Sequence, residues 1–105
     1  MEKLKSELRQ QLVRLKSRYQ SEGFVILGVF GSFARGEENA DSDIDLLYQI
    51  EAPFFLHNSG FNALSRLDQI KHELMEALGR DVDIAPKNSA NRVLKEEVER
   101  DLVYV

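Results

Sequence analysis

The sequence of 105 residues contains no cysteine, so it forms no disulfide and offers no thiolate for catalysis. No apolar run approaches the roughly 20 residues that cross a bilayer, and the charged first residues do not resemble a signal peptide. We therefore expect a cytoplasmic protein that does not contact a membrane. Hydrophobic residues make up 43% and charged residues 30% of the chain, which is typical of one globular domain over residues 1–105.

Several common motifs of catalysis and binding are also missing. There is no glycine-rich P-loop ending in lysine and no Gly-x-Gly-x-x-Gly dinucleotide fingerprint. His72-Glu73 lacks the second histidine of a zinc protease, and the serines have no histidine and aspartate partners at a readable spacing. The net charge of −4 argues against nucleic acid as the main partner.

The spacing of apolar residues predicts a chain that alternates between helices and strands. Apolar residues at steps of three and four indicate helices, and continuous runs rich in β-branched and aromatic residues indicate buried strands. A loop is expected around Pro53 and the Asn58-Ser59-Gly60 cluster. These rules predict helices over roughly residues 2–21, 61–78 and 90–100, strands over 24–30, 43–50 and 81–85, and a β-like run over 102–105.

The order of these elements, α-β-(turn)-β-α-β-α, predicts an α+β fold. The segment between the first two strands, residues 31–42, is too polar for a strand and has room for one helical turn. It lacks the long helix that a parallel crossover needs. We therefore expect a small mixed β-sheet flanked by helices rather than a Rossmann arrangement.

Two carboxylates stand at the start of the second predicted strand. Residues i and i+2 of a strand point to the same face, so Asp43 and Asp45 lie side by side. Two carboxylates held this close repel each other, and a divalent cation such as Mg²⁺, which prefers oxygen ligands, removes the conflict. Asp81 and Asp83 on the third predicted strand could each supply a further carboxylate.

A second polar group follows the first predicted strand. Gly31-Ser32 comes directly after a buried strand and before a short helical turn, where exposed backbone N–H groups can bind an anion. Each of these features alone is common in ordinary turns. Gly-Ser, then Arg35-Gly36, then Asp-x-Asp entering an apolar strand is a specific combination.

That combination resembles the nucleotidyltransferase fold of the polymerase-beta superfamily, in particular its minimal nucleotidyltransferase subfamily. The resemblance covers nearly the whole chain and includes a later aspartate between apolar residues. It assigns the third carboxylate to Asp83, which lies between Val82 and Ile84, rather than to Asp81.

The resemblance implies a reaction and a set of site residues. It implies that Asp43, Asp45 and Asp83 are catalytic and bind two Mg²⁺ ions that hold ATP. Gly31 and Ser32 would bind the triphosphate, with Arg35 as a cationic clamp. Members of the subfamily are typically paired with a HEPN-domain protein as antitoxin and toxin, so the resemblance implies transfer of AMP to a hydroxyl of such a partner.

Two other functions stay open from the sequence. The chain could neutralise its partner by complex formation alone, or it could modify a hydroxyl of a small molecule such as an antibiotic. We find no extension that would hold an acceptor, so we expect a second chain or a second copy to hold it, in a homo- or hetero-oligomer. We expect Phe54, Phe55 and Phe61 to pack in the core or anchor a loop rather than line an adenine pocket.

Overall fold

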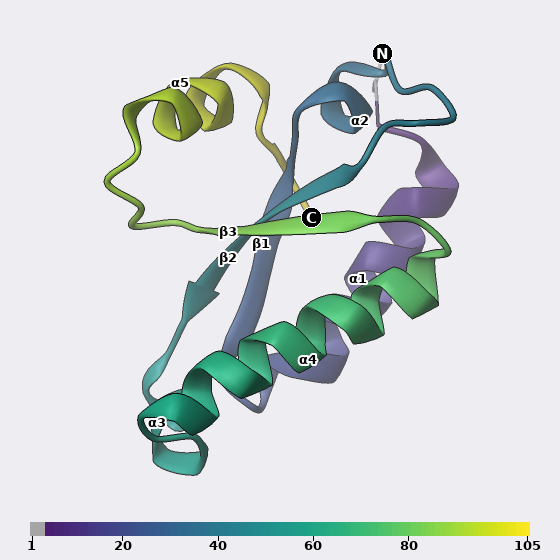
Figure 1. The fold of residues 1–105 in the computed structure, drawn as a ribbon. Helices are drawn as coiled ribbons and strands as arrows, with labels where there is room; N and C mark the ends of the chain where they lie inside the picture. Colours follow the sequence, from purple (N-terminus) through teal and green to yellow (C-terminus); the bar gives the residue numbers. More distant parts are fainter. Residues whose placement is uncertain (1–3) are drawn as a thin grey trace.

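A computed structural model describes residues 4–105 of the chain (Figure 1). Within these residues, no helix is long and apolar enough to cross a membrane. The first two positions of the helix predicted from residue 2 lie outside the described part of the chain. The helices are α1 (Ser6–Gln20), α2 (Ser32–Arg35), α3 (Ala52–His57), α4 (Phe61–Leu78) and α5 (Arg92–Asp101), and the strands are β1 (Phe24–Phe30), β2 (Ile44–Ile50), β3 (Val82–Pro86) and β4 (Val103–Tyr104).

The strands form one mixed sheet in the order β3-β2-β1-β4. β1 and β2 are antiparallel and are joined through the single turn of α2, as the short polar connection predicted. β2 and β3 are parallel because the long helix α4 returns the chain to the starting end of the sheet. β4 pairs antiparallel with β1, so the apolar run at residues 102–105 is used inside the sheet. The expected α+β fold is confirmed.

One face of the sheet holds the main core. α1 and α4 cover this face in Figure 1 and bury the apolar stripes that their sequences predict. The strands contribute every second side chain to the same core, because successive residues of a strand point to opposite faces. The fully buried members of this core include Leu12, Tyr19, Phe24, Ile26, Leu46, Ile70, Leu74 and Val82.

The other face of the sheet is covered only in part, by α5. Leu94 and Val98, one helical turn apart, pack against Phe30, Leu47 and Ala85. This second core is small. Asp45 and Asp83 lie on the same face of the sheet, near the first residues of β2 and β3, and each precedes a member of this core by two residues.

The segment expected to be a loop around Pro53 contains the helix α3 instead. Proline is favourable in the first turn of a helix, where its missing N–H has no helical partner, and Pro53 occupies that place. Phe54 is buried in the main core, as expected. The expectation of packing is wrong for Phe55 and Phe61, which are largely exposed. Phe55 follows the inward-facing Phe54 by 100° around α3, and Phe61 is the first residue of α4.

Candidate active site

Asp45 lies at the centre of the candidate site, near the start of β2. Its neighbours across the sheet are Phe30 of β1 and Asp83 of β3. Paired residues of adjacent strands are about 4.8 Å apart and share a face, so Asp45 and Asp83 stand side by side. Asp43 precedes Asp45 by two residues and is exposed, whereas Asp45 is partly buried.

The pKa of the Asp45 carboxyl is raised to about 6. Burial is the largest cause, and the negative charges of Asp83, Glu97 and Asp43 add to it, while Arg35 opposes them. The ionised form of Asp45 is therefore disfavoured by its surroundings. A cation bound beside it would compensate this cost.

Three carboxylates do not form a ready ligand set in this structure. Within residues 4–105, no three acidic or histidine side chains stand close enough together to hold one metal ion. An oxygen of Asp83 lies 3.7 Å from the ammonium nitrogen of Lys71 on α4. The residues nevertheless suit Mg²⁺, because Asp45 and Asp83 present hard oxygen donors at paired positions and the charge of Asp83 raises the pKa of Asp45.

The register of the sheet also separates the two aspartates flanking Val82. Asp83 pairs with Asp45 inside the parallel ladder. Asp81 precedes β3, and its backbone oxygen accepts a hydrogen bond of 3.0 Å from the N–H of Ile44. Two carboxylates that share one site must be adjacent, and Asp83, not Asp81, is adjacent to Asp45 in the sheet.

Gly31 lies between β1 and α2, against the carboxylate of Asp45. Its φ of 77° lies in the left-handed region, which favours glycine. A Cβ at Gly31 would collide with Oδ2 of Asp45, so only glycine lets the backbone pass this close to the carboxylate. Ser32 follows at once as the first residue of α2. The structure thus places Gly31 and Ser32 next to Asp45.

Arg35 is occupied by carboxylates of the protein itself. Its Nη1 donates to Oδ2 of Asp101 at 2.7 Å, and its Nε donates to Glu37 at 3.2 Å. Asp101 has only 3% of its side chain exposed and also accepts two hydrogen bonds of 3.0 Å from Arg100. These hydrogen bonds hold the pKa of Asp101 below its usual range. Arg35 therefore ties α2 to the end of α5, which the sequence did not indicate.

Arg80, which the sequence analysis did not single out, lies behind the site. Its Nη1 donates to the backbone oxygens of Asn39 and Ser42, each at 2.9 Å, just before Asp43. Its guanidinium also lies 5.0 Å from the ring centre of Phe33 in α2. Arg80 thus contacts both α2 and the loop that leads to the carboxylates. No motif marks it, because its partners are about 40 residues away in the chain.

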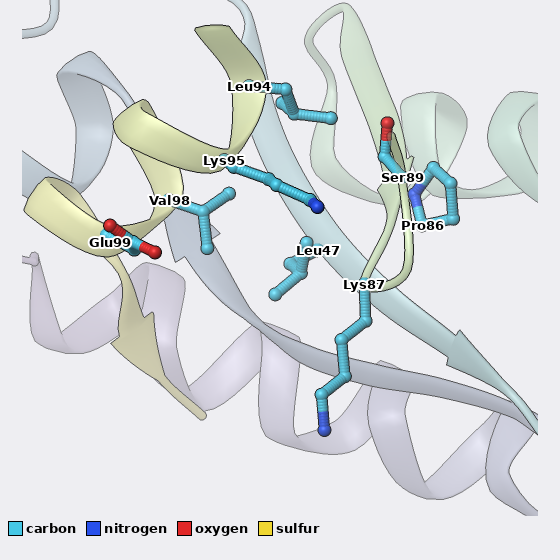
Figure 2. Close-up of a pocket in the computed structure, with 8 residues that line it drawn as sticks. All are labelled: Leu47, Pro86, Lys87, Ser89, Leu94, Lys95, Val98 and Glu99. Atoms are coloured by element: carbon cyan, nitrogen blue, oxygen red, sulfur yellow. The ribbon is translucent and has the colours of Figure 1, made fainter. Parts of the chain in front are cut away.

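A cavity of about 300 Å³ lies between α5, the middle of β2 and the end of β3 (Figure 2). Leu47, Leu94 and Val98 form apolar walls, and the side chain of Lys95 extends from α5 across it. Leu47 follows Asp45 by two residues on β2, so the cavity lies on the same face of the sheet as the Asp45 carboxylate.

Comparison with known proteins shows which family the chain belongs to. The model of the nucleotidyltransferase domain family matches residues 5–105, and the chain belongs to this family of nucleotidyltransferases. "Putative protein adenylyltransferase MJ1217" of Methanocaldococcus jannaschii is 32% identical over 106 residues, covering 100% of this chain and 97% of that protein. "Protein adenylyltransferase MntA" of Thermococcus cleftensis is 31% identical over 105 residues, covering 100% and 95%.

Solved structures show the same fold. A structure described as a "putative minimal nucleotidyltransferase" superposes with a TM-score of 0.72 at 32% identity, covering 100% of this chain and 97% of its own. A chain of a toxin–antitoxin crystallised with AMP-PNP superposes with a TM-score of 0.65 at 22% identity, covering 90% and 69%. The second likeness concerns the fold alone.

Proposed function

We propose that this nucleotidyltransferase transfers AMP from ATP to a hydroxyl group of a partner protein, and that it thereby acts as an antitoxin for a HEPN-type toxin. Relatives of nearly equal length that are named protein adenylyltransferases support the reaction. A relative that is 31% identical is named MntA, a name that also stands in a solved toxin–antitoxin structure, MntA-HpeT, and this supports the biological role. The observation that carries the proposal is the junction of Gly31, Asp45 and Asp83 at one end of the sheet.

Each part of the reaction has residues suited to it. The turn at Gly31 and Ser32 binds the β- and γ-phosphates of ATP and leaves the α-phosphate near Asp45. The acceptor hydroxyl attacks the α-phosphorus, a new P–O bond forms, and the bond to pyrophosphate breaks. Asp83, exposed beside Asp45, takes the proton from the hydroxyl. Positioning and charge neutralisation account for most of the catalysis in this scheme.

Asp43, Asp45 and Asp83 would hold two Mg²⁺ ions, which neutralise the triphosphate and the charge that develops on it. Movement of Asp83 away from Lys71 would let its carboxylate join the other two, since the ion pair of 3.7 Å is long and exposed. Arg35 is paired in the protein, so we assign it to holding α2 in place, and direct contact with phosphate stays a prediction from the resemblance.

The proposal is tested by intact-mass measurement. The chain, ATP and Mg²⁺ are incubated with the protein encoded beside it, and both chains are weighed. We expect a mass increase of AMP on the partner that requires ATP and Mg²⁺. The variant carrying Asp43→Ala and Asp45→Ala should bind the partner but leave its mass unchanged, and it should not neutralise the partner.

Two results would contradict this proposal. Full neutralisation by the double variant would show that complex formation is sufficient, as in a binding antitoxin. AMP transfer to a small hydroxyl compound, with no modified protein, would replace the partner protein by a small-molecule acceptor.

A further inference from the structure

Four large apolar side chains are exposed at one end of the molecule. Phe55 and Leu56 on α3 are 60% and 82% exposed, and Phe61 and Leu64 at the start of α4 are 88% and 66% exposed. We call these four residues the apolar tip. Only three residues join α3 to α4, and Figure 1 shows both at the same end of the sheet. Large exposed apolar surfaces are typical of interaction sites.

The apolar tip is presented rigidly. Phe54, next to Phe55, is fully buried, and its ring packs edge-on against that of Phe55 with centroids 5.9 Å apart. The backbone of α3 passes so close to Gly23 that a Cβ there would meet the N–H nitrogen of Phe54 at 2.5 Å. The backbone of Glu51 also donates to the oxygen of Gly23 at 2.8 Å. A preorganised surface loses little conformational freedom on binding.

The segment that carries the apolar tip is almost free of charge. Charged residues make up 30% of the chain, yet Arg66 is the only one between Ala52 and Leu67. Arg66 is itself paired with Glu22 and Glu73. Depletion of charge together with aromatic enrichment is typical of the centre of a protein interface. A partner recognised by opposite charge would find only Arg66 in this segment, and Arg66 is already paired within the protein.

These features fit a second copy of the same chain. The chain carries a net charge of −4, so two copies repel unless they meet through an uncharged surface. At these exposures, the four side chains present roughly 500 Å² of apolar surface, since a large aromatic side chain buries about 150–250 Å². Two tips together would bury about 1,000 Å², the lower limit of a specific interface.

We propose that two copies of this chain associate through the apolar tip, each tip packing against the other about a two-fold axis. Such an arrangement is isologous, so each apolar side chain contributes twice to the contact. The small area predicts a dimer that dissociates on dilution. The carboxylates around Asp45 do not take part, because no residue of the apolar tip belongs to that site.

Sedimentation equilibrium of the purified chain tests the proposal, over concentrations from about 5 µM to about 1 mM, where an interface of this size dissociates. We expect the mass to rise from monomer to dimer. The variant carrying Phe61→Glu and Leu64→Glu should dimerise at least about tenfold more weakly. Because the contact is uncharged, raising the salt concentration should not weaken the wild-type dimer.

The matched control carries Val13→Glu and Val93→Glu, which add the same charge at positions 46% and 65% exposed on other helices. This control should dimerise like the wild type. A second tip variant with Phe55→Ser and Leu56→Ser adds no charge and should also weaken the dimer, and circular dichroism verifies that each variant is folded. A wild-type chain that stays monomeric at the highest concentration overturns the proposal. Equal loss of dimer in the control also overturns it.

Discussion

Asp45 is a partly buried carboxylate whose surroundings disfavour its charge. Its pKa of about 6 lies above the value expected in an unfolded chain, so the folded protein binds the proton more tightly. Stability from this group is present at low pH and is lost as the pH rises through the folded pKa. A positive charge brought next to Asp45 would lower this pKa and favour the ionised form.

Replacing Asp45→Asn should therefore stabilise the metal-free protein. The amide keeps the shape of the carboxyl group but carries no charge, so we expect a gain of about 1–3 kcal/mol at pH 7.5. The gain should vanish below about pH 4, where the carboxyl is protonated in both states. Urea denaturation in the presence of a chelator measures both values. A loss of stability at pH 7.5 would instead indicate that the carboxylate is a structural hydrogen-bond acceptor.

Ser32 should act on ATP and not on folding. It is the first residue of α2 and lies outside the core, so Ser32→Ala should leave the melting temperature nearly unchanged. Loss of one hydrogen bond to a charged phosphate costs about 1.5–3 kcal/mol, so affinity for ATP with Mg²⁺ should fall roughly tenfold or more. Calorimetric titration measures it. Ser65→Ala on the exposed side of α4 is the matched control, and equal affinity in both variants would move the phosphate site elsewhere.

Asp101 should make the protein sensitive to acid. Its hydrogen bonds from Arg100 and Arg35 hold its folded pKa below the unfolded value. The stability it contributes is therefore present above about pH 4 and is lost as the pH falls through the folded pKa. Asp101→Asn should cost about 1–3 kcal/mol at pH 7 and should flatten the decline of stability between about pH 5 and pH 3. Urea denaturation at a series of pH values tests this, and an unchanged slope would contradict it.

At the scale of elements, the sequence pattern was enough to predict a helix or strand where its buried residues recur with the period of that element. The predicted strand 24–30 and helix 61–78 coincide with β1 and α4, and the other strands differ by about one residue at an end. The stripe on α4 was less well predicted, because Leu64 is exposed whereas Ile70 and Leu74 are buried. The sequence did not predict α3 for two reasons. Proline occurs both in loops and at the start of helices, and α3 buries a single aromatic residue, so it shows no repeat of apolar positions.

The candidate site likewise has residues that the sequence indicates and residues that it does not. Asp43, Asp45, Gly31 and Ser32 could be proposed from the sequence because their spacing along one segment carries the signal, and their roles stay predictions. Side-chain partners from distant segments could not be found, because nothing in a single sequence pairs Arg35 with Asp101 or Arg80 with the loop before Asp43. The pairing of Arg35 changes its expected part in the site, and only the tertiary structure reveals it.

Arg80 should connect two elements of the site. Arg80→Ala removes its bonds to Asn39 and Ser42 and its stacking on Phe33, so both the carboxylate loop and α2 become less constrained. We expect about 1–2 kcal/mol of lost stability and weaker binding of ATP with Mg²⁺. Arg80→Lys should restore only part of this, since it lacks the planar fork. Arg92→Ala, at an exposed position on α5, is the control in denaturation and titration, and equal effects of the two alanine variants would contradict the role.

At the scale of the whole molecule, the end of the chain closes the structure. β4 covers the edge of β1, and the N–H of Val105 donates to Leu27 at 3.0 Å. Arg9 and Lys16 of α1 donate to the backbone oxygens of Tyr104 and Val105 at 2.9 and 2.8 Å. The last residues thus join the sheet to the first helix, and they follow directly after Asp101, which holds α2 through Arg35.

Deleting residues 103–105 should therefore affect both stability and association. The deletion removes several backbone and side-chain hydrogen bonds, so we expect a loss of about 2–4 kcal/mol. It also uncovers the N–H and C=O groups of β1, and an open strand edge promotes aggregation. Thermal unfolding with light scattering measures both effects. The substitution Tyr104→Ala keeps the backbone pairing and removes a side chain that is mostly exposed, so it should change little. If that substitution destabilised the protein as much as the deletion, the side chain rather than the strand pairing would be responsible.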